Sequence, residues 1–219
     1  NRLLERALCR GRSERGVGRS KPFLETNEND IFHIVEDIEK LRKHFGFDRI
    51  WLFGGSFGST IALTYAIKYP EHTAGMLIRG IFLGRQEDCD WLYSGAQNFY
   101  WPEYQEFISE VKDVKKTSEI IPAYLKKITS SDQSICDRAA LKWANYELSL
   151  VFPIKRSEIL ATTTTVAERQ IALMESFFFA NKTFKDDDNF ILANIHKAKD
   201  IPTYIVHGRY DMVCPLKQA

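Results

Sequence analysis

A short glycine-rich motif, Gly54-Gly55-Ser56-Phe57-Gly58, has the spacing of a turn that presents a nucleophilic serine. In such a turn a buried strand bends sharply into a helix, and glycines two positions before and after the serine let strand and helix approach closely. The N–H groups at the start of the helix then face the oxygen that becomes negative when the serine attacks a carbonyl. We therefore predict Ser56 as a nucleophile and the Phe57 N–H as an oxyanion donor. An ordinary glycine-rich turn fits the same five residues.

A phosphate-binding loop is the other chemistry that a glycine-rich turn before a helix can serve. The lysine of G-x-x-x-x-G-K-[ST] is absent here, and so is the dinucleotide pattern G-x-G-x-x-G. The sequence therefore favours nucleophilic catalysis over phosphate binding.

The candidate acid is Asp211, which follows the apolar run 204–206. Sites in open α/β sheets form at the carboxyl ends of the strands. A carboxylate there can orient a histidine and stabilise its imidazolium form. An aspartate in the tetrapeptide 208–211 is also typical of a simple turn.

The third member of such a triad, a histidine, should follow the acid in chain order. No histidine follows Asp211; the five in the chain are His33, His44, His72, His196 and His207. We interpret each as structural or solvated, and His207 as too close in sequence to Asp211 to be its usual partner. We expect the base to lie beyond Ala219. The 219-residue chain should then be nearly inactive, because a serine without its base keeps little nucleophilicity.

The elements around these residues alternate between helix and strand. Apolar spacing of three and four predicts an amphipathic helix over 30–45. The apolar run 50–53 predicts a central parallel strand buried on both faces, followed by a helix over 59–69 and a strand at 76–78. A further strand is predicted within 202–208. This alternation indicates a parallel sheet covered by helices.

The segment between the second and the last strand has a different pattern. It contains helical periodicity without obvious strands, over residues 104–114, 119–128, 135–150 and 166–178. About a hundred residues of this kind suggest an inserted helical cap. We predict a core formed by residues 1–84 and 185–219, with the cap over 85–184.

Composition excludes several classes of protein. The 30 basic and 29 acidic residues give a net charge of +1, so charge provides no case for nucleic acid or an anionic membrane as a partner. No apolar run approaches the roughly 18 residues of a transmembrane helix, and no signal-peptide core is present. The four cysteines are scattered. That distribution is typical of reduced thiols in a cytoplasmic protein. It matches neither the spacing of a zinc site nor that of a disulfide framework. We expect no metal and no cofactor.

Five blocks of sequence together resemble one family, the proline iminopeptidases (prolyl aminopeptidases), which are α/β hydrolases. The similar blocks are residues 15–22, 35–42, 53–60, 77–82 and 206–215, and they span nearly the whole chain. The resemblance implies an α/β-hydrolase fold with an inserted all-helical cap, incomplete at both ends. It implies release of an N-terminal proline from peptides.

The resemblance also implies where the substrate binds. The motif W-A-N-Y-E ends at Glu147 and the motif M-E-S-F-F-F contains Glu175. In this family two such glutamates would hold the cationic N-terminus. Phe82, Tyr93 and Phe179 are then candidate walls for the proline ring. Without the resemblance, the glutamates fit a solvated helix face and the aromatic residues fit a core.

Two departures from the family pattern remain. The family's H-G-G-P-G loop, which supplies a second oxyanion donor, is absent. Ser13 and Glu14 stand where the family has Asp and Gln, and residues 1–12 lack the usual apolar strand. Two other functions stay open: an esterase or amidase on the same fold, and a non-catalytic hydrolase-like binding protein.

Overall fold

The computed structural model describes residues 14–152 and 160–219. Its strands form one parallel sheet in the order β1-β2-β3, with β1 at Ile50–Ser56, β2 at Thr73–Ile81 and β3 at Thr203–Val206. The register pairs Ser56 with Ile81. The predicted parallel sheet is confirmed. The arginine-rich start of the chain, including Cys9 and Ser13, lies outside the described residues.

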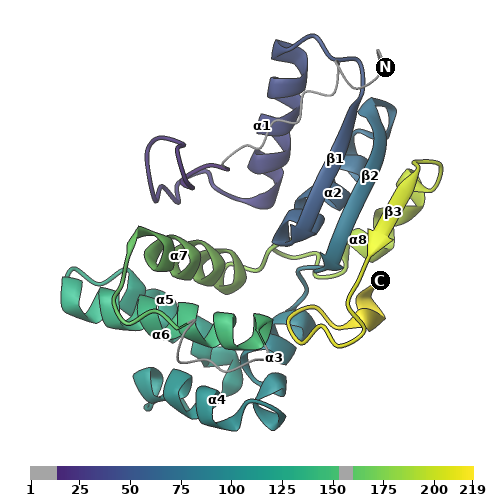
Figure 1. The fold of residues 1–219 in the computed structure, drawn as a ribbon. Coiled ribbons are helices and arrows are strands. Elements are labelled where there is room, and N and C mark those ends of the chain that lie inside the picture. The colour runs from purple at the N-terminus through teal and green to yellow at the C-terminus, as the bar shows by residue number, and fades with distance from the viewer. Residues whose placement is uncertain (1–13, 153–159) are drawn as a thin grey trace.

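Helices cover one face of this sheet (Figure 1). Helix α1 spans Ile31–His44, and its first turn is capped by the Asp30 carboxylate, which accepts hydrogen bonds from the N–H groups of Phe32 and His33. Helix α2 spans Phe57–Lys68 and packs on β1, β2, α1 and the short helix α8 at Phe190–Asn194. Every residue of α2 from 59 to 67 is buried, as expected of a helix enclosed on all sides.

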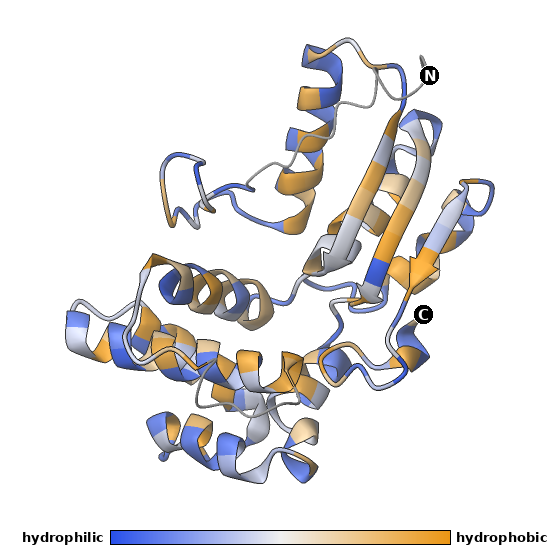
Figure 2. Ribbon diagram, viewed as in Figure 1, coloured by the Kyte–Doolittle hydropathy of each residue, from blue (hydrophilic) through white to orange (hydrophobic). Residues whose placement is uncertain are grey.

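The opposite face of the sheet is open among the described residues, and this corrects the prediction that β1 is buried on both faces. Leu52 faces the helices and is 8% exposed, whereas Trp51 and Phe53 are 59% and 75% exposed. Tyr204 on β3 is also exposed, and its ring stacks on Trp51. The reason is that α2, with α1 and α8 packed on it, covers the face of the sheet to which Leu52 points (Figure 1). Figure 2 shows the hydrophobic residues along β1.

A layer of five helices lies beyond the carboxyl ends of β1 and β2 (Figure 1). The four helices predicted for this region are present as α4, α5, α6 and α7, whereas the fifth, α3, was missed. Their bounds are Gln86–Tyr93 for α3, Trp101–Ile108 for α4, Ile120–Ile128 for α5, Gln133–Val151 for α6 and Val166–Ala180 for α7. No helix in the described ranges is long and apolar enough to cross a bilayer.

Aromatic rings fill the interior of this helical layer. Phe107 stacks on both Tyr124 and Tyr146 with centroids 4.5 Å apart, and Trp143 lies 4.5 Å from Tyr93. All five side chains are at most 2% exposed. Such pairs add about 0.5–1.5 kcal/mol each beyond the burial of their area. The packing fixes α6 relative to α3 and α4, which matters because α6 carries a candidate site residue.

Candidate active site

The strained bend predicted at Ser56 is present. Ser56 ends β1 with φ 53° and ψ −128°, and α2 begins at the next residue. A positive φ is uncommon for a residue with a side chain. A Cβ atom at Gly54 would lie 2.2 Å from the Gly58 carbonyl oxygen, so this close approach requires a glycine at 54. A Cβ at Gly58 would meet nothing within 4 Å, so of the glycines two positions before and after the serine only Gly54 is required by close contact.

Hydrogen bonds from α2 lock the bend in place. The Ser59 hydroxyl donates to the Ser56 carbonyl at 2.6 Å and accepts the Phe82 N–H at 3.0 Å. The Phe57 N–H is the first of α2, where N–H groups have no carbonyl one turn earlier to bind. The Ser56 side chain forms no cap hydrogen bond to the helix. The Phe57 N–H therefore has no hydrogen-bond partner within α2 and lies next to Ser56 in the chain.

The loop that carries Asp211 lies at the same end of the sheet. Its Oδ1 atom accepts the N–H groups of Val213 at 3.1 Å and Cys214 at 2.8 Å. Its Oδ2 atom would lie 3.3 Å from a Cβ built on Gly80, the residue before the pairing partner of Ser56. Oδ1 thus stabilises the loop conformation through backbone hydrogen bonds, whereas Oδ2 faces the carboxyl end of β2.

Cys214 connects this loop to the bend. Its thiol is 1% exposed, and burial raises its pKa to about 12, partly offset by a hydrogen bond with the Ser56 side chain. At neutral pH the thiol is therefore protonated. The structure brings the two predicted catalytic residues, Ser56 and Asp211, to the same end of the sheet, with Cys214 as a neighbour of both.

His207 has a structural position in the same loop. Its Nδ1 accepts the Ile81 N–H at 3.3 Å, and its Nε2 lies 2.7 Å from the Cys214 carbonyl oxygen. These partners require the neutral tautomer with its proton on Nε2, because Nδ1 accepts and a carbonyl can only accept. With both nitrogens occupied, the ring ties the end of β2 to the end of the Asp211 loop.

Glu147 and Glu175 come together between α6 and α7. The Tyr93 hydroxyl donates to Glu147 Oε1 at 2.6 Å, and the Trp143 indole donates to Glu175 Oε2 at 2.8 Å. Neither carboxylate forms an ion pair with any lysine or arginine among the residues described. Burial raises the pKa of Glu147 to about 7. Burial, together with the charge of Glu147, raises the pKa of Glu175 well above its usual range. The pair behaves as two interacting carboxylates that lack a cation.

A line of aromatic rings joins this pair to the bend. Phe179 contacts Phe57 at 6.3 Å between centroids, Phe82 at 5.5 Å and Tyr93 at 6.0 Å. Tyr93 in turn binds Glu147. The three aromatic residues predicted for the substrate pocket therefore form one buried cluster between the serine and the glutamates.

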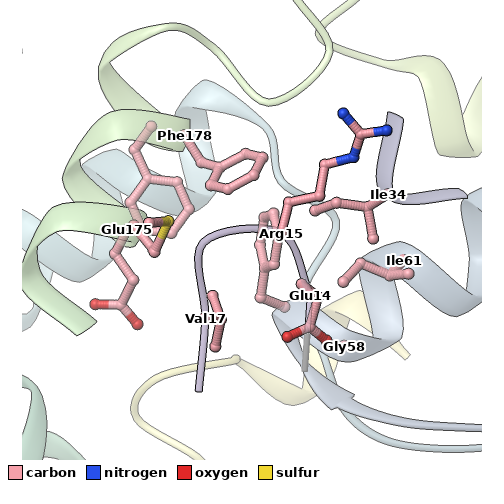
Figure 3. Close-up of a pocket in the computed structure, with 11 residues that line it drawn as sticks. Glu14, Arg15, Val17, Ile34, Gly58, Ile61, Glu175 and Phe178 are labelled. Carbon is pink, nitrogen blue, oxygen red and sulfur yellow. The ribbon is translucent and has the colours of Figure 1, made fainter. Parts of the chain in front are cut away.

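A cavity of about 200 Å³ opens beside the bend, between α7 and the loop at residues 14–17 (Figure 3). Phe57, Phe179 and Glu175 line it, whereas Phe82 and Tyr93 do not. Sequence reasoning missed most of its wall, which also includes Glu14, Arg15, Val17, Ile34, Gly58, Ile61, Met174 and Phe178. The helical spacing of Met174 and Phe178 places both on the face of α7 that carries Glu175 and Phe179, and that signal could have found them.

Comparison with known proteins places the chain in a class. The family described as the alpha/beta hydrolase fold matches residues 13–219. The chain therefore belongs to the α/β hydrolase fold family. A structure of an α/β hydrolase enzyme from a deep-sea metagenome library aligns over 94% of this chain and 63% of its own, with a TM-score of 0.47 and 17% identity.

Within this class, the chain is similar to several curated proline iminopeptidases. The chain is 36% identical over 210 residues to a probable proline iminopeptidase of Leptolyngbya boryana, covering 94% of this chain and 64% of that protein. It is 36% identical over 208 residues to the proline iminopeptidase of Neisseria meningitidis serogroup A, covering 94% and 66%. The resemblance found in the sequence blocks is confirmed, and the chain spans about two thirds of the length of these relatives.

Proposed function

We propose that the protein to which this chain belongs is a serine aminopeptidase that releases an N-terminal proline from peptides. The Ser56 hydroxyl attacks the carbonyl carbon of the first residue and forms an acyl-enzyme, which water then hydrolyses. The oxygen of the tetrahedral intermediate accepts the Phe57 N–H. Asp211 orients the histidine that takes the serine proton and passes it to the leaving amine.

The chain itself has no histidine after Asp211, and both nitrogens of His207 are occupied. We propose that the base lies outside these 219 residues and that the isolated chain is nearly inactive. Longer relatives of 36% identity support this reading. We also propose that residues 85–184 act as a cap, since helices α3 to α7 lie over the strand ends that carry the serine.

The observation that supports aminopeptidase activity best is the glutamate pair. Two carboxylates with raised pKa values and no cation between them, Glu147 and Glu175, provide a site for a charged imino group. A bound cation would favour the ionised form of both carboxylates and form charge-assisted hydrogen bonds with them. The ring cluster around Phe179 would contact the apolar pyrrolidine, between that site and Ser56.

The test compares three substrates on the full-length protein: a prolyl arylamide, the same compound with an acetylated nitrogen, and a short acyl ester. We expect turnover of the free prolyl arylamide and its loss on acetylation, because acetylation removes the charge that the glutamates bind. Ester hydrolysis without release of proline would instead identify an esterase. A protein that turns over no substrate and resists a fluorophosphonate probe would be a binding protein.

A further inference from the structure

Helix α3 contacts the Asp211 loop on one of its faces. The Trp91 indole N–H donates to the Met212 carbonyl at 2.8 Å. One turn earlier on the same helix, the Asp88 carboxylate accepts the Gln218 side-chain amide at 2.8 Å. Residues three apart share a helix face. This face of α3 therefore contacts the Asp211 loop at Met212, directly beside Asp211, and contacts the short 3-10 helix after that loop at Gln218.

The next residues of α3 contact the glutamate site. The Tyr93 hydroxyl donates to Glu147 at 2.6 Å, and the Leu92 carbonyl accepts the Tyr146 hydroxyl at 2.9 Å. Trp91 and Tyr93 are two positions apart, which turns their side chains about 200° from one another around the axis. One turn of α3 thus contacts the Asp211 loop on one side and α6, the helix that carries Glu147, on the other.

This helix is well placed to act as a rigid spacer. In its first turn the Asp88 carboxylate accepts hydrogen bonds from the Arg85 backbone N–H at 3.0 Å and from the Arg85 guanidinium at 3.0 Å. Asp88, Leu92 and Tyr93 are each 2% exposed. Because its core-facing side chains are close-packed, the helix cannot shift on one side without disturbing the other.

The contact at Met212 bears directly on the carboxylate. Asp211 Oδ1 accepts the N–H groups of Val213 and Cys214, and the Met212 carbonyl lies within that same turn. Fixing this carbonyl fixes the rotation of the turn, and with it the direction of Oδ2. Without the indole N–H, the turn would lose its only side-chain anchor to α3 at that peptide among the described residues.

We propose that α3 sets the position of the catalytic acid relative to the amine-binding carboxylates, with Trp91 as the positioning residue on the acid side. This rests on the proposed function. The arrangement would hold the scissile carbonyl at a fixed distance from the bound N-terminus, as an enzyme that removes one residue requires. Trp91 touches no reacting atom and acts only through Met212.

The test uses Trp91→Phe in the full-length protein, with Trp101→Phe as the matched control. Trp101 lies on α4 and is 57% exposed. A fluorophosphonate titration counts active sites, and kcat per site is measured with the prolyl arylamide and the acyl ester. We expect Trp91→Phe to lower kcat about tenfold for both substrates, since small misplacements of catalytic groups are costly. KM for the prolyl substrate should change less than about twofold, and the control should match the wild type.

Other outcomes separate the two proposals. An unchanged kcat per site in Trp91→Phe would overturn the role of α3, even if the variant melts at a lower temperature. If that variant does not fold, Gln218→Met removes the contact between Gln218 and Asp88 with a side chain of similar volume. An unchanged kcat per site in Gln218→Met would also contradict the proposed role of α3. If the wild type hydrolyses the ester but releases no proline, the proposed function fails, while the ester kcat still tests α3.

Discussion

Ser56 and Asp211 are linked through Cys214, whose N–H binds the aspartate and whose thiol lies against the serine side chain. The serine is carried by a bend between β1 and α2, and the aspartate by the loop after β3. Two segments separated by about 150 residues therefore meet at one end of the sheet.

The first prediction concerns stability and pH. Burial raises the folded-state pKa of Glu147 to about 7, above the value of about 4.3 for an unfolded glutamate. The folded protein thus binds more protons than the unfolded chain between these values. The contribution of Glu147 to the free energy of unfolding should therefore be greatest below about pH 4 and should be lost as the pH rises through 7.

Glu175→Gln removes the repulsion between the two carboxylates. Its melting temperature should exceed that of the wild type at pH 8, and the difference should shrink toward pH 5. Thermal unfolding between pH 5 and pH 8 measures this. Glu119→Gln, an exposed glutamate, serves as the control. A wild-type curve that is flat over this range, or a variant that is less stable at pH 8, would contradict the raised pKa values.

The second prediction uses two glycines of the same motif. Gly54→Ala would place a Cβ 2.2 Å from the Gly58 carbonyl, whereas Gly58→Ala would meet nothing within 4 Å. We expect Gly54→Ala to lower the free energy of unfolding by about 1–3 kcal/mol, as overpacking does. Gly58→Ala should be neutral or slightly stabilising, because alanine favours helix by up to about 1 kcal/mol. Denaturant unfolding of both variants checks the order, and equal effects would count against the close approach.

The third prediction separates a structural His207 from a catalytic one. Loss of a general base from a serine–histidine pair lowers kcat on the order of 10⁶-fold. His207→Gln in the full-length protein should instead lower kcat less than roughly tenfold. It should also lower the free energy of unfolding by about 1–3 kcal/mol, the cost of an unsatisfied buried group. A near-complete loss of activity in a variant that remains folded would make His207 the base.

Much of the core was predictable from local pattern. The apolar stripe and the capping Asp30 define α1, and the motif around Ser56 defines the bend, because both signals depend on near neighbours in sequence. The exposure of Trp51 and Phe53 was not predictable. Their apolar character indicates burial, and only the three-dimensional arrangement shows that the helices lie on the other face.

Helix α3 and the pairing of Glu147 with Glu175 could not be predicted from the local sequence pattern. The eight residues of α3 have little apolar periodicity, and the helix depends on the hydrogen bonds that Arg85 donates to Asp88 and on contacts distant in sequence. Glu147 and Glu175 are on different helices, so no spacing rule pairs them, and the family resemblance alone suggested their common role. The donors Tyr93 and Trp143, which fix the two carboxylates, emerge only from the fold.

The most direct test of the account is to find which residue a fluorophosphonate modifies in the full-length protein. Mass spectrometry of the digested adduct should place the label on Ser56, and Ser56→Ala should lose both the label and the turnover of a prolyl arylamide. Ser134→Ala is the control, since Ser134 is an exposed serine on α6 away from the bend, and it should keep the label. A label on another residue, or turnover that survives in Ser56→Ala, would contradict the assignment of Ser56 as the nucleophile.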